Sequence, residues 1–212
     1  MGKKCFEITS ACFKDFIRYP DFVVQSGSTI FIEGASGTGK SSLLKILNGV
    51  NNLSDGQINF FGQDIDDIDT IELRRRVTLV GQSVFLFDMS IRENFREFYR
   101  YRGLDLISDG EIREYLDICL VDFDIDADCS QMSGGEKHRV YIAIFLSLSG
   151  EVILLDEPTA ALDENNSINL IGNIKSFAVE KGKTLIIVSH NTVLAEKFAD
   201  SVISITKEAS YE

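Results

Sequence analysis

The 212-residue chain lacks any apolar run that approaches the roughly 20 residues needed to cross a bilayer as a helix. Its N-terminal residues are not followed by the apolar stretch of a secretory signal either. These two absences predict a cytoplasmic protein that reaches a membrane only where a partner holds it there.

Basic residues are scarce, because the chain has 21 lysines and arginines against 33 aspartates and glutamates, a formal net charge of −12. A surface this acidic repels the phosphates of nucleic acids, so we expect no nucleic-acid partner. A local cationic pocket for a nucleotide remains compatible with this overall charge.

Cysteines and histidines are too few and too scattered to indicate a metal site of thiolates and imidazoles. The four cysteines form no C-x-x-C pair, and the chain has only two histidines, His138 and His190. In a cytoplasmic protein, cysteines are expected to be free thiols packed as small hydrophobic side chains. This expectation applies to Cys5, Cys12, Cys119 and Cys129.

A glycine-rich segment has the spacing G-x-x-x-x-G-K-S of a phosphate-binding loop, or P-loop. It consists of Gly34, Ala35, Ser36, Gly37, Thr38, Gly39, Lys40 and Ser41. Residues 29–32, before this segment, are typical of a buried strand. Residues 42–47, after it, are typical of a helix that ends at Gly49. The glycines let backbone N–H groups turn toward a polyphosphate at the N-terminus of that helix.

This P-loop predicts a nucleoside triphosphate site that also includes Ser42. Lys40 would reach the outer phosphates, and the Ser41 hydroxyl would hold Mg²⁺. The alternative is a glycine-rich turn with an incidental lysine. The strand before and the helix after weigh against that alternative.

Two carboxylates, Asp156 and Glu157, directly follow the apolar run of residues 152–155. Four consecutive apolar residues are typical of a strand buried on both faces, and α/β folds bind ligands at the carboxyl ends of such strands. We expect Asp156 to bind Mg²⁺ and Glu157 to polarise a water against the γ-phosphate. An acidic turn that ends a strand is the alternative, which the upstream P-loop disfavours.

The segment Ser133-Gly134-Gly135-Glu136 is typical of a capping box at the start of a helix that runs to about residue 148. A capping box does not explain two consecutive glycines, which are costly in a first helical turn. Free N–H groups without side chains at a helix N-terminus suggest the close approach of an anion. We expect His138, on the same helix, to lie at the surface.

Strands and helices alternate over most of the chain, which predicts an α/β fold with a mostly parallel sheet and helices on both faces. The segments at about 1–33 and 53–65 have the pattern of an antiparallel β subdomain. The segment at about 83–132 has the pattern of an inserted helical subdomain. Residues 34–52, 66–82 and 133–212 would form a P-loop NTPase core. The whole chain, 1–212, is therefore expected to be one domain.

Together with the P-loop and the run Leu-Leu-Asp-Glu-Pro-Thr at 154–159, the segment Met-Ser-Gly-Gly-Glu at 132–136 resembles the L-S-G-G-Q signature of ABC-type ATPases. Further matches follow in the family's order, over about residues 5–206. Gln82 looks like the Q-loop glutamine, a ligand of magnesium and water. Asp163 looks like the D-loop aspartate, and His190 looks like the switch histidine that contacts the γ-phosphate.

The family also carries an aromatic side chain that stacks on adenine, for which Phe13 is the candidate in this chain. Packing within a hairpin or the core is the favoured reading of Phe13, because phenylalanine is more often buried than placed on a ligand.

The resemblance implies a head-to-tail homodimer with two ATP molecules between the subunits. Each ATP would lie on Lys40 of one copy and face Ser133, Gly134 and Gly135 of the other. Magnesium would be held by Ser41, Gln82 and Asp156, and the catalytic residues would be Glu157, His190 and Gln82. The resemblance also implies a separate integral membrane permease, so that the ATPase would work as a peripheral protein on the inner face of the cell membrane.

Residues 82–88 lie where relatives hold the cytoplasmic helix of the permease. The apolar run Phe85-Leu86-Phe87 could form an exposed dock for that helix or fill the core. Residues 86–94 look like the corresponding region of exporter ATPases, which gives a mild preference for export.

The alternative function is a non-transport ABC ATPase that acts as a regulatory or assembly switch, of the iron–sulphur assembly or cell-division type. A chromosome-maintenance ATPase is disfavoured, because residues 89–130 are too few for a long coiled coil. A small GTPase is disfavoured by the absence of an N-K-x-D string.

Overall fold

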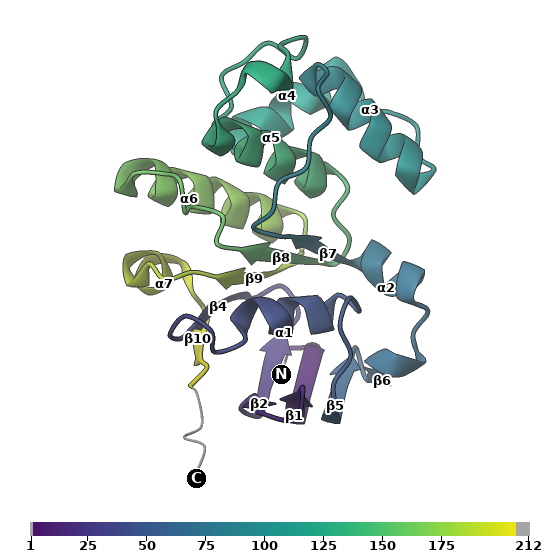
Figure 1. Cartoon of the computed structure of the whole chain (residues 1–212), viewed down its shortest axis with the longest axis vertical. Coiled ribbons are helices and arrows are strands. Elements are labelled where there is room, and N and C mark those ends of the chain that lie inside the picture. The colour runs from purple at the N-terminus through teal and green to yellow at the C-terminus, as the bar shows by residue number, and fades with distance from the viewer. Residues whose placement is uncertain (1, 207–212) are drawn as a thin grey trace.

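Two five-stranded sheets, one parallel and one antiparallel, organise the computed structural model (Figure 1). The structure describes residues 2–206, so the predicted domain limits at residue 1 and within 207–212 lie outside the described residues. The α/β class predicted from the sequence is confirmed. In the part of the chain that the structure describes, no helix is both long and apolar enough to span a membrane.

The parallel sheet has the strand order β10-β4-β9-β8-β7. Its strands are β4 (Thr29–Glu33), β7 (Val77–Val80), β8 (Val152–Asp156), β9 (Thr184–Val188) and β10 (Ser201–Ser204). Every residue of β8 and β9 is buried, as expected for strands covered on both faces.

Side chains of the parallel sheet alternate between two hydrophobic clusters, one on each face. On one face, Leu155 packs with residues of α6 (Glu164–Glu180). On the other face, Leu154 packs with residues of α1 (Lys40–Leu47) and of the antiparallel sheet. This alternation follows from the two-residue period of a strand.

The antiparallel sheet is built around the long strand β1 (Lys4–Phe13). Its other strands are β2 (Ile17–Arg18), β3 (Phe22–Gln25), β5 (Asp55–Phe60) and β6 (Gln63–Asp64). The structure corrects the predicted limit at residue 33, because β4 pairs in parallel with β9 and β10 and so belongs to the core. A local pattern of short strands does not reveal which sheet each strand joins.

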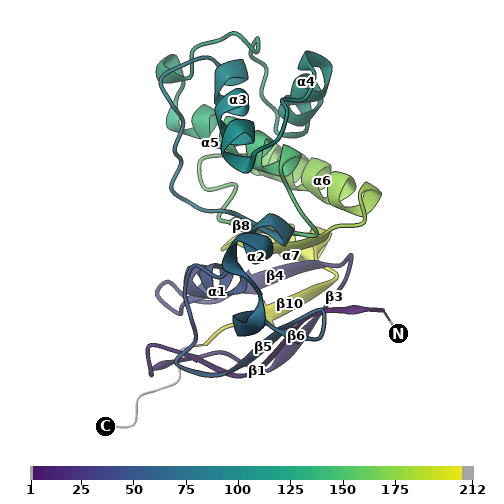
Figure 2. The ribbon, with the colours of Figure 1, turned by 90° about the vertical axis from the view of Figure 1, so that its right-hand side faces the viewer.

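Three helices form the end of the molecule farthest from the antiparallel sheet (Figures 1 and 2): α3 (Ile91–Arg102), α4 (Asp109–Ile118) and α5 (Gly134–Ser147). The predicted limit at residue 133 separates α5 from this group, whereas α5 packs against α3 and α4 as well as β7. Phe95 and Ile142 belong to the same hydrophobic cluster as Leu155 of the sheet. The helical part therefore shares one continuous core with the parallel sheet.

Three helices begin at serine residues that cap their N-termini. Capping boxes begin α3 at Ser90, α4 at Ser108 and α5 at Ser133, and the predicted box at Ser133 is thus confirmed. The remaining helices are α2 (Thr70–Arg76), α7 (Thr192–Phe198) and the 3₁₀ turns η1 (Ile65–Asp67) and η2 (Cys129–Gln131).

The expectation that His138 lies at the surface is wrong. Its residue is buried, and its Nε2 has no hydrogen-bond partner among the described residues. The reason is tertiary, because α5 lies between the sheet and the other two helices and buries more than one of its faces. All four cysteines are free and buried, as predicted.

The shared core predicts that the sheet and the helical part unfold together. Phe95 is fully buried in this shared core, so Phe95→Ala should lower the free energy of unfolding by about 3–5 kcal/mol through lost contacts and a cavity. Urea denaturation should show a single unfolding transition for the unmodified chain and for the Phe95→Ala variant. The control is Phe16→Ala, at a side chain that is 70% exposed. A similar loss of unfolding free energy in the two variants would contradict the place of Phe95 in the shared core.

Candidate functional site

A hollow of about 470 Å³ opens at the carboxyl ends of the parallel strands. Its lining comes from segments far apart in the sequence: Ile17, Ser36, Gly37, Gly39, Lys40, Ser41, Ser42, Gln82, Glu157, Ala160, Val188 and His190. Carboxyl ends of parallel strands meet at one edge of a sheet, which is where α/β folds place ligands. The P-loop, Gln82, Glu157 and His190 are therefore brought together as the sequence predicts.

The P-loop backbone requires glycine at two positions. Gly34 and Gly39 have φ angles of 152° and 96°. A Cβ on Gly34 would lie 2.3 Å from the carbonyl oxygen of Ile205, and one on Gly39 would lie 2.7 Å from Cγ2 of Ile17. The loop leads into α1, whose first turn has no side-chain cap and no acidic residue. The free N–H groups and the helix dipole at this end favour an anion.

Lys40 is held inside this loop by backbone carbonyls. Its Nζ donates hydrogen bonds to the oxygens of Gly34, at 2.8 Å, and Ala35, at 2.9 Å. Thr38 is also buried in the loop, where its Oγ1 donates to the same Ala35 oxygen at 3.0 Å. Among the described residues, the hydrogen-bond acceptors of Lys40 are neutral carbonyls, so a phosphate oxygen would be a stronger partner than either of them.

Ser41 and Asp156 form the second part of the site. The hydroxyl of Ser41 donates to Oδ1 of Asp156 at 3.0 Å, and Asp156 is buried at the end of β8. Gln82, which follows β7, lines the same hollow. Hydroxyl, carboxylate and amide oxygens are hard ligands of the kind that Mg²⁺ takes, with phosphate oxygens and water completing its shell. These residues therefore fit a magnesium ion bound together with a nucleotide.

Glu157 and His190 lie next to each other in the lining of the hollow. Oε1 of Glu157 lies 3.3 Å from Nε2 of His190 and has no hydrogen-bond partner within the described part of the chain. Burial raises the pKa of Glu157 above its ordinary value, and the nearby His190 and Lys40 oppose this rise. A higher pKa makes the carboxylate a better proton acceptor, which suits a general base.

The backbone of Glu157 holds its side chain in this position. Its N–H donates to the oxygen of Val188 at 3.0 Å, which ties the end of β8 to β9. Its φ angle of 52° is an uncommon left-handed value for a residue that is not glycine.

Three lining residues were missed by the sequence analysis: Ile17, Ala160 and Val188. They belong to no motif, and only the fold brings them to the P-loop. Phe13 pairs with Ile17 across β1 and β2 and packs against the core, and it does not line the hollow. Its stacking on adenine therefore stays a prediction.

The signature segment lies outside this hollow. Ser133 is exposed as the N-cap of α5, and a Cβ on Gly134 would meet no atom within 4 Å. Asp163 is likewise exposed, and it caps α6 by accepting a hydrogen bond from the N–H of Asn166 at 2.9 Å. Within one copy of the chain, neither Ser133 nor Asp163 reaches the P-loop hollow.

The chain is similar to known proteins in both sequence and fold. Residues 18–160 match the family model for ABC transporters. The phosphonates import ATP-binding protein PhnC of Fusobacterium nucleatum is 32% identical over 206 residues, which cover 91% of this chain and 83% of that protein.

Two solved structures share the fold. A bacterial Atm1-family ABC exporter with ATP bound superposes with a TM-score of 0.83 at 25% identity, over 96% of this chain and 37% of that one. A dimeric bacterial ABC transporter cassette gives a TM-score of 0.81 at 23% identity, over 95% of this chain and 94% of that one. With these matches, the chain belongs to the ABC transporter family, among its ATP-binding proteins.

Proposed function

We propose that the chain is the ATP-hydrolysing subunit of an ABC transporter, which works as a homodimer on a separate membrane permease. The observation that carries this proposal is the single hollow that combines a P-loop lysine, the Ser41–Asp156 pair and the Glu157–His190 pair. This combination supplies phosphate binding, metal binding and a base for water. The protein would sit on the inner face of the membrane, where the permease holds it.

A homodimer would complete the site. Ser133 and Gly134 are exposed and do not line the hollow of their own chain. Their helix N-terminus favours an anion, and the missing side chains leave room for close approach. In a head-to-tail dimer, the γ-phosphate on Lys40 of one copy would meet Ser133, Gly134 and Gly135 of the other. Hydrolysis would remove this contact and open the dimer.

In the proposed reaction, a water oxygen attacks the γ-phosphorus, and the bond from the γ-phosphorus to the β–γ bridging oxygen breaks as ADP leaves. Glu157 accepts the proton of the water, and His190 orients the γ-phosphate or the water beside it. Lys40 neutralises negative charge on the phosphates. Mg²⁺, when held by Ser41, Gln82 and Asp156, supplies further neutralisation of the β- and γ-phosphates.

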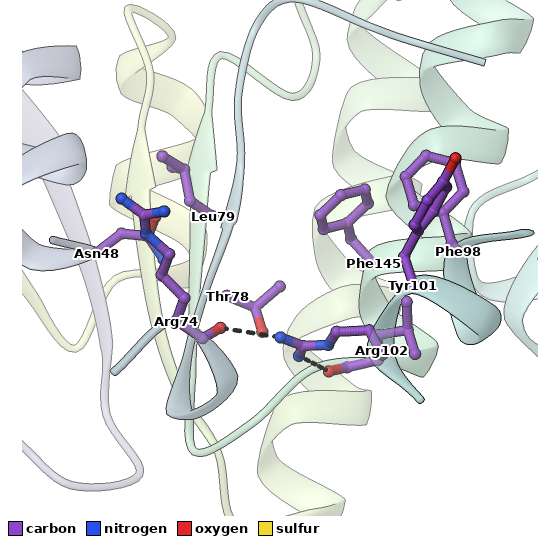
Figure 3. Close-up of a pocket in the computed structure, with 9 residues that line it drawn as sticks. Asn48, Arg74, Thr78, Leu79, Phe98, Tyr101, Arg102 and Phe145 are labelled. Atoms are coloured by element: carbon purple, nitrogen blue, oxygen red, sulfur yellow. Dashed lines mark hydrogen bonds between the residues drawn. The ribbon is translucent and has the colours of Figure 1, made fainter. Parts of the chain in front are cut away.

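The face that would dock the permease lies next to the Q-loop. A hollow of about 240 Å³ is lined by Asn48, Arg74, Thr78, Leu79, Phe98, Tyr101, Arg102, Phe145 and Leu148 (Figure 3). Both readings of the run at 85–87 hold in part: Phe85 is 60% exposed, Leu86 packs against the core, and the Phe87 ring contacts Phe98 and Tyr101. An apolar hollow with exposed aromatic rings suits a short helix of a partner.

The direction of transport stays a prediction. A relative named for import and a structure described as an exporter are both similar to this chain. The mild preference for export therefore rests on residues 86–94 alone. The alternative of a non-transport switch has no particular observation in its favour.

The general-base role of Glu157 predicts the behaviour of Glu157→Gln. This variant should bind ATP, lose about 10²–10⁴-fold in turnover and accumulate as an ATP-bound dimer, because the water is no longer deprotonated. Phosphate release and size-exclusion chromatography measure these effects. Glu180→Gln makes the same change at an exposed glutamate at the end of α6 and serves as the control. Turnover of Glu157→Gln near that of this control would refute the assignment.

The proposed head-to-tail dimer, in which ATP lies between two copies, makes a prediction for Ser133→Arg. This variant should not form the ATP-driven dimer, while a single copy should still bind ATP. An arginine side chain would occupy the space that the second copy's phosphate needs. Ser108→Arg is a matched control, because Ser108 forms the same kind of capping box with Glu111 and both variants lose a cap. If Ser133→Arg forms the dimer as efficiently as Ser108→Arg does, the proposed head-to-tail dimer is ruled out.

The transporter assignment predicts that an integral membrane protein co-purifies with the chain from membranes in mild detergent. Mass spectrometry of the purified complex identifies this partner. Recovery of a soluble scaffold protein in its place would favour the alternative of an assembly or regulatory switch.

A further inference from the structure

Tyr19 reaches the P-loop from the antiparallel sheet. Its hydroxyl donates a hydrogen bond to the carbonyl oxygen of Gly39 at 3.1 Å. The Tyr19 residue is only 4% exposed, and it belongs to the hydrophobic cluster that also contains Leu154 of the parallel sheet. Burial, with a smaller contribution from Cys12, raises the pKa of Tyr19 above its ordinary value. The hydroxyl therefore remains protonated and is a hydrogen-bond donor throughout the neutral pH range.

Two hydrogen bonds to β1 hold the segment that carries Tyr19. The N–H of Tyr19 donates to the oxygen of Ala11 at 2.9 Å, and the N–H of Ser10 donates to Oδ1 of Asp21 at 2.6 Å. Pro20 lies between Tyr19 and Asp21, and its ring restricts the backbone further. The strand β1 is itself paired with β3 and β5. The hydroxyl is therefore presented to the P-loop by a rigid support.

The acceptor, Gly39, is the residue at which the P-loop becomes helix α1. Its carbonyl oxygen also accepts a hydrogen bond from the N–H of Leu43 at 2.9 Å. A carbonyl oxygen has two lone pairs, so Tyr19 and Leu43 together satisfy this acceptor. A Cβ on Gly39 would lie 3.0 Å from the Tyr19 hydroxyl oxygen, so the missing side chain lets the tyrosine approach. The direction of the Gly39 carbonyl is thus fixed from two sides.

The peptide group that joins Gly39 to Lys40 carries this carbonyl oxygen on one edge and the N–H of Lys40 on the opposite edge. Because the peptide is planar and trans, fixing the oxygen also fixes the N–H. This N–H belongs to the first turn of α1, where N–H groups have no partner within the helix. Glycine has an unusually free backbone, so with fewer anchors this peptide would rotate more readily.

We propose that Tyr19 is a positioning residue for polyphosphate binding, whose hydroxyl holds this peptide with the Lys40 N–H directed at the bound phosphates. Tyr19 does not line the P-loop hollow, so it acts through Gly39 and not by touching the nucleotide. A donor that is already oriented loses less freedom when it binds an anion, and the anion is bound more tightly. This inference rests on the function proposed above in taking the P-loop as the site of ATP.

Tyr19→Phe removes the hydroxyl and keeps the ring, and it tests the proposal on the full chain. The variant is titrated, with Mg²⁺ present, with the non-hydrolysable ATP analogue AMP-PNP and with tripolyphosphate, which has no base. It should bind both probes about three- to tenfold more weakly than the unmodified chain does. Calorimetry measures the first affinity, and displacement of a fluorescent ATP analogue measures the second. The two losses should be equal, because the Lys40 N–H would contact phosphate and not the base.

Tyr99→Phe is the matched control. Tyr99 of α3 is 5% exposed, its hydroxyl donates to the backbone oxygen of Ser147 at 3.4 Å, and it does not line the P-loop hollow. Both variants therefore lose a buried tyrosine hydroxyl that is bonded to a backbone carbonyl. A purely structural role of Tyr19 would lower thermal stability without changing the affinity of the folded chain for either probe. Circular dichroism checks that both variants are folded during the titrations.

Two further measurements separate positioning from packing. In turnover assays, Tyr19→Phe should raise KM for ATP by the same factor and leave kcat within about twofold, because the N–H binds the phosphates alike before and during the reaction. Replacement of Tyr19 by para-aminophenylalanine restores a donor at the same place, so it should recover most of the lost affinity.

Two results would overturn the inference. One is an affinity of Tyr19→Phe for AMP-PNP equal to that of Tyr99→Phe. The other is a weaker affinity for AMP-PNP with an unchanged affinity for tripolyphosphate, which would place the effect at the base. If the unmodified chain binds AMP-PNP and Tyr19→Phe binds it equally well, the role of Tyr19 is refuted and the proposed function stands. If the unmodified chain does not bind AMP-PNP, the proposed function and this inference both fail.

Discussion

Burial of the parallel sheet on both faces is the constraint on which the rest of this structure depends. The strands β8 and β9 are apolar throughout, and their alternate side chains anchor two clusters that hold the helices on either side. Because neighbouring strands are fixed in register, their carboxyl ends lie at one edge. The P-loop after β4, Asp156 and Glu157 at the end of β8, and His190 after β9 are therefore neighbours.

The site places its own negative charges close to where a polyphosphate would bind. Asp156 accepts a hydrogen bond from the hydroxyl of Ser41. Glu157 is partly buried next to His190 and Lys40, and its raised pKa reflects this burial. Positive charge and free N–H groups come from Lys40 and the start of α1, so recognition of an anion is compatible with an acidic chain.

A buried amide connects the nucleotide site to the proposed docking face. Asn94 of α3 is fully buried, and its side chain pairs with both backbone groups of Phe87: it accepts from the N–H at 2.9 Å and donates to the oxygen at 3.1 Å. The loop that carries Gln82 is thereby fixed to the helix that carries Phe98 and Arg102.

The sequence by itself determined the features that are local in the chain. These include the P-loop, the carboxylates at the end of β8, the capping box at Ser133 and the order of the family motifs. The tertiary structure decided the features that depend on distant segments. It placed β4 in the parallel sheet, buried His138, brought Ile17 to Gly39 and brought Arg74 of α2 and Arg102 of α3 to one hollow. Caps and loops act over a few residues, whereas strand pairing and helix packing join residues that no short pattern can relate.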